Sequence, residues 1–226
     1  MATAKQITRI LPPIAPRLVA APIEYDPRFF EQYSNALRLY FNGVDTTFGS
    51  LFGSPKTGTD LHPGGSYLNF PYAAVQNTTD HTFVANTPTL ITFDQVDYIN
   101  DCTNNAADGI HVKNAGVYNY QFSVQWRNTD SQAHDAWIWL RLNGVDVAGT
   151  GSQFTVPSKH GVVNGHLIAA ANFYIQMNAG DYVEMWAAVN DATVSMEDYP
   201  AQTSPFAMPS IPSVVATLTF VSSIPA

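Results

Sequence analysis

The sequence has a single cysteine among 226 residues, which excludes a fold held together by intrachain disulfides. Charged residues are scarce as well, at 12% of the chain, whereas a typical soluble domain has about 25%. The polar surface must therefore consist mainly of Asn, Thr, Ser and Gln, and long helices laced with ion pairs are not expected. Uninterrupted apolar runs of about 18 residues are missing too, so the sequence predicts no membrane insertion.

The formal net charge is −8, and the acidic excess lies after residue 41, because residues 1–41 are slightly basic. An acidic body repels phosphate backbones, and the few basic residues are not interleaved with stacking aromatics. The sequence therefore predicts no nucleic-acid binding. The first ten residues, MATAKQITRI, lack the apolar core of a secretory signal, so we expect synthesis in the cytoplasm.

The sequence is rich in residues that build a core: 46% are hydrophobic and 12% are aromatic. This content excludes intrinsic disorder, and the length suits one large β domain or two small ones.

Residues 1–25 contain four prolines among apolar residues that follow neither a helical nor an alternating period. Prolines at this density disfavour a helix and keep the backbone extended. Such a segment is either a loose tail or an arm that becomes ordered by docking on another surface. We favour an anchoring arm, whose candidate contact residues are Ile10, Leu11, Ile14, Leu18 and Val19.

One helix is predicted over residues 26–45, since Asp26-Pro27 is a typical start and Asn42-Gly43 a typical stop. Its apolar residues recur at spacings of three and four, namely at Phe30, Tyr33, Leu37, Tyr40 and Val44. This face packs either on its own domain or a neighbouring protein, or forms a short trunk shared by identical subunits. Residues 46–71 are rich in Gly, Ser, Thr and Pro and are predicted to be a linker.

Residues 72–226 have the pattern of antiparallel strands. Apolar and polar residues alternate over 116–127, and residues 135–143 are apolar on both faces, which indicates a strand covered on both sides. Asn143-Gly144 predicts a hairpin turn, and residues 178–180 predict a second hairpin between strands 164–177 and 181–190. Regular short strands with Gly and Asn turns predict a mainly β protein, an antiparallel sandwich or jelly roll, with an N-terminal extended arm and one short helix.

Roughly residues 81–222 resemble the jelly roll of the complement globular head and tumour necrosis factor superfamily. Ala115-Gly116-Val117-Tyr118 with its alternating aromatics is similar to that family's Pro/Ala-Gly-x-Tyr strand, and NAGDYV (178–183) is similar to its x-x-Gly-Asp-x-Val turn and strand. The resemblance implies an obligate homotrimer with aromatic residues around a threefold axis. The aromatic residues assigned to this interface are Trp137, Trp139, Tyr118 and Tyr120.

The N-terminal sequence LPPIAPRLVAAPIEYDPRFFEQYSNALRLYFNGVD is similar to the start of structural proteins of tailed bacteriophages that carry such a jelly roll behind it. Animal members of the superfamily carry collagen-like stalks or membrane anchors instead, so their receptor-signalling function is not transferred. The combination implies a virion component.

Residues with reactive side chains offer weak signals of chemistry. Cys102 has no base beside it in the sequence, so we interpret it as an ordinary thiol. His160 and His166, and the His134-Asp135 pair, match no recognised zinc spacing. Calcium binding by loop carboxylates stays open, although they lack the spacing of a dedicated loop; the candidates are Asp94, Asp97, Asp101 and Asp108. No cofactor is predicted, and the chain is interpreted as a non-enzyme.

Two functions of different class follow. The first is a structural subunit of a virion, a homotrimer fixed to capsid or tail proteins by its arm, which decorates or stabilises the particle. The second is a tail-fibre or spike tip that recognises a host surface glycan or protein, with a binding surface in the long loop 191–212. The candidate residues of that loop are Tyr199, Phe206 and Met208.

Overall fold

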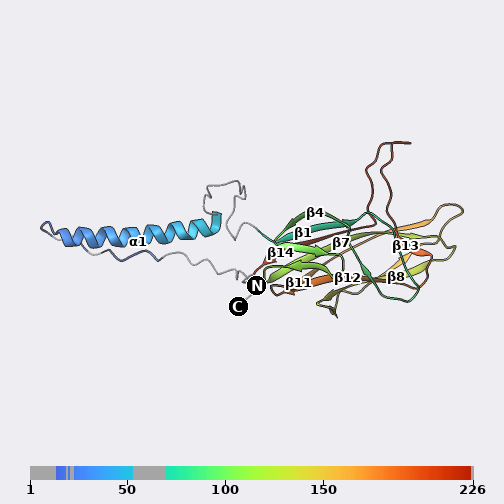
Figure 1. Cartoon of the computed structure of the whole chain (residues 1–226), viewed down its shortest axis with the longest axis horizontal. Coiled ribbons are helices and arrows are strands. Elements are labelled where there is room, and N and C mark those ends of the chain that lie inside the picture. Colours follow the sequence, from blue (N-terminus) through green and yellow to red (C-terminus); the bar gives the residue numbers. More distant parts are fainter. Residues whose placement is uncertain (1–13, 19, 21–22, 53–69, 225–226) are drawn as a thin grey trace. The chain divides into compact units, whose positions relative to one another are not determined.

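The structure is a computed structural model that describes residues 14–18, 20, 23–52 and 70–224. The chain divides into two compact units, one within Ile7–Phe70 and one built from Pro71–Ala226. The first contains the helix and the second contains the β-sheets (Figure 1). Each unit is described by itself.

Helix α1 spans Pro27–Phe52 and begins where the sequence predicts. Asp26 caps it, because its Oδ1 accepts a hydrogen bond from the Arg28 amide at 2.9 Å. The helix does not stop at Gly43 but continues into the predicted linker, so its predicted end is wrong. Two hydroxyls bond to carbonyls one turn earlier, Thr46 to Asn42 at 2.8 Å and Thr47 to Gly43 at 2.9 Å.

The half-buried face of α1 begins at Phe29 rather than at Phe30. Phe29 stacks on Tyr33 with ring centroids 6.0 Å apart, and the face continues through Leu37, Tyr40 and Val44. Phe30 lies beside it, stacks on Tyr25 and is 49% exposed. The helix therefore carries a broad apolar face. No helix in the described part of the chain is both long enough and apolar enough to cross a membrane.

The described part of the arm exposes its apolar side chains. Ile14 is 93% exposed and Ile23 is fully exposed, while Leu18 is 45% exposed. Ile10, Leu11 and Val19 lie outside the described residues. The described side chains of the arm thus find little cover within their own unit.

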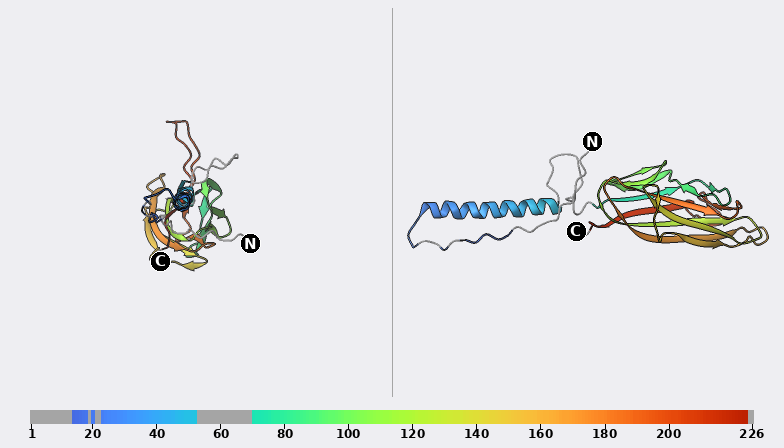
Figure 2. Two further views of the ribbon diagram at one scale, coloured as in Figure 1. Left: turned by 90° about the vertical axis from the view of Figure 1, so that its left-hand side faces the viewer. Right: turned by 90° about the horizontal axis from the view of Figure 1, so that it is seen from below.

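The second unit is an antiparallel β-sandwich (Figures 1 and 2). Its strands are β1 (Tyr72–Asn77), β2 (His81–Thr82), β3 (Thr89–Ile91), β4 (Gln95–Asn100), β5 (Cys102–Asn105), β6 (Gly109–Val112), β7 (Gly116–Asn128), β8 (His134–Leu142), β9 (Val145–Asp146), β10 (Ser152–Val156), β11 (Gly165–Met177), β12 (Tyr182–Val189), β13 (Val194–Met196) and β14 (Val214–Ser222).

The pairing of the strands defines a jelly roll. In sheet A, β11 pairs with β7, β7 with β14, β14 with β1, and β1 with β4. Strand β13 pairs with the last residues of β7, beyond the part of β7 that pairs with β14. Strand β2 pairs with β13. In sheet B the order is β10-β8-β12-β6-β5. The five longest strands, β7, β8, β11, β12 and β14, thus alternate between the two sheets in chain order, as in the double Greek key of this architecture. The predicted fold class is confirmed.

The hairpin at Asn143-Gly144 forms as predicted, with β9 and β10 both pairing with β8. The predicted hairpin at residues 178–180 is wrong, because β11 pairs with β7 in sheet A while β12 lies in sheet B. The turn bonds to a third strand instead: the Gly180 amide donates to the Val112 carbonyl at 2.8 Å. Strands β11 and β12 bury their apolar faces in the same core and therefore lie opposite each other across it.

The core lies between the two sheets. Its largest fully buried side chains include Trp126, Tyr118 and Tyr120 from β7, and Ile138 and Leu140 from β8. Burial of such side chains stabilises a fold by about 1.5–3 kcal/mol each. Every second residue of β7 points into this core, which confirms the alternation predicted from the sequence.

Candidate functional site

A projecting double strand, here called the finger (residues 199–211), connects β13 to β14. It rises from the sandwich as a narrow ladder (Figure 1). Two bridges hold its sides together, Tyr199 with Ile211 and Gln202 with Met208. Each bridge has amide-to-carbonyl hydrogen bonds in both directions, at 2.8 Å and 2.8 Å for the first and at 3.0 Å and 2.9 Å for the second.

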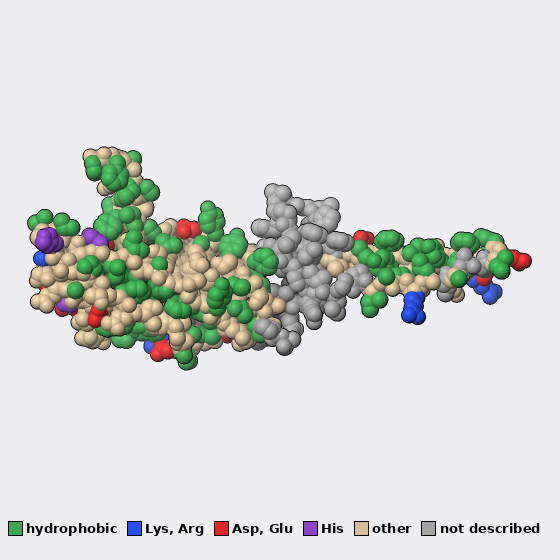
Figure 3. All heavy atoms as spheres, turned by 180° about the vertical axis from the view of Figure 1, so that it is seen from behind, with side chains coloured by type: hydrophobic (Ala, Val, Ile, Leu, Met, Phe, Trp, Pro, Cys, Tyr) green, Lys and Arg blue, Asp and Glu red, His purple; other side chains and the backbone are tan. Residues whose placement is uncertain are grey.

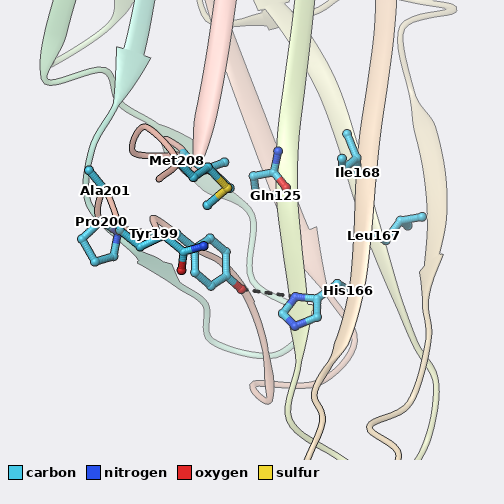
Figure 4. Close-up of a pocket in the computed structure, with 10 residues that line it drawn as sticks. Gln125, His166, Leu167, Ile168, Tyr199, Pro200, Ala201 and Met208 are labelled. Atoms are coloured by element: carbon cyan, nitrogen blue, oxygen red, sulfur yellow. Dashed lines mark hydrogen bonds between the residues drawn. The ribbon is translucent and has the colours of Figure 1, made fainter. Parts of the chain in front are cut away.

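The finger and sheet A enclose a pocket of about 620 Å³, here called the finger pocket (Figure 4). One wall is made by β7 and β11, and the other by the finger. The lining is mostly apolar, with two amides, an imidazole and a phenol among it. The lining residues are Gln125, His166, Leu167, Ile168, Tyr199, Pro200, Ala201, Gln202, Met208 and Ile211.

A polar network fixes the base of the finger to sheet A. Glu197, only 4% exposed, pairs with Arg127 of β7. The Tyr199 hydroxyl donates to Glu197 Oε2 at 3.0 Å and lies 3.2 Å from His166 Nδ1. Burial raises the pKa of Tyr199, which keeps this donor protonated. With the hydroxyl proton directed to Glu197, the neutral tautomer of His166 that fits this geometry donates through Nδ1–H and has Nε2 as an acceptor.

The outer face of the part of sheet A that β11, β7 and β14 form, here called face A, has almost no charge. It is made by the alternate residues of β7, β11 and β14 that point away from the core. Among them one side chain is charged, Arg127, and Glu197 pairs with it. The residues of face A are Val117, Asn119, Gln121, Ser123, Gln125, Arg127, His166, Ile168, Ala170, Asn172, Tyr174, Gln176, Val215, Thr217, Thr219 and Val221.

Face A also carries exposed apolar side chains and one buried polar atom without a hydrogen-bond partner in the described structure. Ile168 is 66% exposed and Tyr174 is 67% exposed, both on β11. Asn119 Oδ1 on β7 is buried and has no hydrogen-bond partner within the described structure. Apolar exposure without charge is the composition of a protein contact rather than of a freely solvated surface.

The outer face of sheet B has a different character. Trp139 and Trp186 stack with ring centroids 6.5 Å apart, and the Arg141 guanidinium lies 4.0 Å above the Trp186 ring. Asp146 accepts hydrogen bonds from Arg141 Nε at 2.6 Å and from Trp139 Nε1 at 2.9 Å. The bond from Arg141, and after it the bond from Trp139, lower the pKa of Asp146. The aromatics are thereby tied to charged neighbours within one chain.

Trp137 and Trp139 are half-buried on this outer face of sheet B. The sequence predicted a strand that is covered on both faces, but in the single chain this outer face is covered only in part. Their contact with a neighbouring subunit stays a prediction. Tyr118 and Tyr120 are 0% exposed and lie in the core, so their assignment to a subunit interface is wrong. Tyr118 donates to the Asn114 carbonyl at 2.7 Å and packs edge-on against Phe220.

The predicted binding loop is divided by the structure. Tyr199 and Met208 lie together in the finger pocket, whereas Phe206 is 61% exposed near the tip and is not part of the lining. Sequence reasoning missed the contribution of His166 and the Arg127–Glu197 pair. These residues are distant in sequence, and only the pairing of β7 with β11 and β13 brings them together.

The candidate calcium carboxylates do not converge. Asp94 accepts from Thr78, Asp97 accepts from Gln76, Asp101 pairs with Lys113 and Asp108 with His111. Among the described residues no group of three or more His, Cys, Asp or Glu residues could hold a metal ion.

Cys102 is 4% exposed, and burial raises the pKa of its thiol to about 12. A thiol with this pKa is almost entirely protonated at neutral pH, so it is a poor nucleophile. The interpretation of Cys102 as an ordinary thiol agrees with this environment.

Fold and site together define a jelly-roll protein with an apolar pocket beneath a projecting finger. No protein-family model matches the chain, and no curated protein matches it either.

Proposed function

We propose that the protein is a structural subunit of a bacteriophage virion, a homotrimer that its N-terminal arm anchors to capsid or tail proteins and whose jelly roll decorates or stabilises the particle. The observation that carries this proposal is the contrast between the two units. The jelly roll has a complete core, while the described arm exposes Ile14 and Ile23 almost entirely. Side chains of this kind need a partner surface.

The N-terminal sequence supports a role in a virion, because it is similar to the start of tailed-phage structural proteins. An extended, proline-rich segment loses less conformational entropy on docking than a flexible one does, since its backbone is already restricted. The arm is therefore suited to lie in a groove of a capsid or tail protein.

The three jelly rolls meet through face A. Its lack of charge matters because each chain carries a net charge of −8, and contact through an uncharged face brings no like charges close together. Ile168 and Tyr174 supply apolar area, and a partner donor satisfies Asn119 Oδ1. Sheet B, with its Trp139–Asp146–Arg141 cluster, then faces outward, so this proposal replaces the subunit contact that the sequence predicted for Trp137 and Trp139.

A phage that lacks the gene tests this function. Purified particles are measured for stability to heat and osmotic shock, and for adsorption to host cells. Lost stability with normal adsorption supports decoration, whereas stable particles that no longer adsorb contradict it.

The anchoring role has its own test. Particles are complemented with either the full chain or a chain that begins at Asp26, and the amount bound per particle is measured. We expect the full chain to bind and the shortened one to be lost from particles. Normal occupancy by the shortened chain would contradict the anchor.

Recognition of a host surface glycan or protein is the second candidate, and one observation favours it. Strongly exposed apolar side chains lie on three loops between strands: Val84 between β2 and β3 is 69% exposed, Val162 and Val163 between β10 and β11 are 100% and 63% exposed, and Phe206 of the finger is 61% exposed. Loops carried by a rigid sandwich are common binding surfaces. In the same phage experiment, loss of adsorption alone would favour this function.

A further inference from the structure

We infer that the finger is an exchange element: the tip of one subunit's finger enters the finger pocket of a second copy, with Phe206 as the inserted side chain. This inference rests on the proposed self-association through face A. It adds a contact between the finger tip and the finger pocket that stabilises the assembly.

The tip does not fill the pocket of its own chain. Hydrogen-bonded bridges at Tyr199–Ile211 and Gln202–Met208 hold the two sides of the finger as a ladder. The chain from Tyr199 to Pro205, in an extended strand, spans about 20 Å. The pocket is lined by residues of both bridges, Tyr199 and Met208 among them (Figure 4), whereas Phe206, at the tip beyond the outer bridge, is 61% exposed and is not part of the lining.

The finger has the composition of a segment that is covered by protein. Residues 199–211, YPAQTSPFAMPSI, contain no charged side chain in a chain with net charge −8. Apolar side chains gather along it in the space-filling view (Figure 3), and Phe206 is 61% exposed. The finger therefore places no like charge in a contact with a second copy of the same acidic chain.

The finger pocket suits this tip in size and chemistry. A cavity of about 150 Å³ holds a benzene ring, so 620 Å³ accommodates the Phe206 ring together with adjacent residues of the tip. Ile168, Met208 and Ile211 supply apolar walls. The amides of Gln125 and Gln202 and the free Nε2 of His166 can bond to the backbone of the incoming turn.

The pocket is also continuous with the proposed subunit contact. Gln125, His166 and Ile168 belong both to its lining and to face A. A neighbour on face A thus lies beside the open pocket, and the finger that rises next to it reaches toward that neighbour. The contact is heterologous, tip to pocket, and such contacts close into rings when their rotation fits.

Cysteine cross-linking tests the inference on the full chain. Phe206→Cys is made in a chain with one affinity tag and Ile168→Cys in a chain with another, and the two are co-expressed and oxidised. The native Cys102 is buried and does not compete. We expect a disulfide-linked pair that contains both tags. Phe206→Cys co-expressed with Val145→Cys is the matched control, because Val145 is 70% exposed at the start of β9 in sheet B, and should give no such pair.

A second variant separates loss of the finger contact from loss of the fold. Phe206→Ala is expected to weaken self-association about tenfold while the circular dichroism spectrum of the folded chain stays unchanged, since the side chain is exposed within its own chain. Oligomers that form no mixed pair, or a Phe206→Ala variant that associates as tightly as the wild type, would overturn finger exchange while leaving self-association standing. A chain that stays monomeric would overturn both proposals.

Discussion

The Tyr199 hydroxyl donates a 3.0 Å hydrogen bond to Glu197 Oε2, and through it the finger is bound to the ion pair between Glu197 and Arg127. Removal of the carboxylate leaves Arg127 without its partner. We expect Glu197→Ala to lower the free energy of unfolding by about 3 kcal/mol. The lower end of the usual range applies because Arg127 is one-third exposed. Tyr199→Phe, which loses one hydrogen bond, should cost about 1 kcal/mol. Urea titration measures both, and equal effects would contradict this order.

Gly116, in the motif Ala115-Gly116-Val117-Tyr118, lies where the structure leaves no room for a side chain. A Cβ there would collide with the Phe220 ring and lie 2.9 Å from the Ser222 carbonyl oxygen. Gly116→Ala should therefore lower stability by about 1–3 kcal/mol through overpacking. Gly151→Ala is the matched control, because a Cβ at Gly151 meets no atom within 4 Å. Thermal melting compares the two, and similar melting temperatures would refute the steric argument.

Face A predicts a charge-sensitive assembly. Ile168→Glu and Tyr174→Glu place a carboxylate in the proposed contact and should each convert trimers to monomers at micromolar concentration. Val145→Glu, at a similarly exposed position on sheet B, should leave the trimer intact. Light scattering coupled to size-exclusion chromatography gives the mass. A wild-type protein that is monomeric at this concentration would contradict the trimer itself.

His81 gives the jelly roll a pH dependence. Burial lowers its pKa below the ordinary value of 6.5, and its Nε2 has no hydrogen-bond partner within the described structure. The unfolded chain therefore binds a proton more readily than the folded one, so stability is complete above about pH 6.5 and falls as the pH drops from there through the folded pKa. His81→Gln should flatten this loss between about pH 7 and pH 5. Urea titrations across this range measure it, and the control His160→Gln, at an exposed turn, should leave the loss unchanged.

Local patterns predicted what depends on neighbours in sequence. The Asp26-Pro27 helix start, the alternation of β7 and the Asn143-Gly144 hairpin each depend on a few adjacent residues, and all are present. The predicted helix end is wrong because Asn42-Gly43 lies inside α1, where the half-buried Val44 continues the apolar face and the Thr46 and Thr47 hydroxyls bond within the helix. The hairpin at 178–180 failed because a turn between sheets has the same residues as one within a sheet.

The site depended on contacts between residues far apart in sequence. Tyr118 and Tyr120 belong to the same alternating strand as face A, and a slip of one residue exchanges core for surface. The alternation alone does not show which face of β7 is buried in the core and which is exposed. The prediction therefore assigned two core residues to the subunit interface. The finger pocket joins residues from β7, β11 and the loop after β13, which only the finished topology brings together.

The position of β14 sets when this fold can form during synthesis. This last strand, Val214–Ser222, lies between β7 and β1 at the middle of sheet A. Until it has left the ribosome, β1 has no partner on that side and β7 keeps one flank open. The sandwich therefore closes late, from contacts far apart in sequence, which makes folding slow. A stop codon in place of Val214 would spare every other strand of the sandwich and still divide sheet A in two.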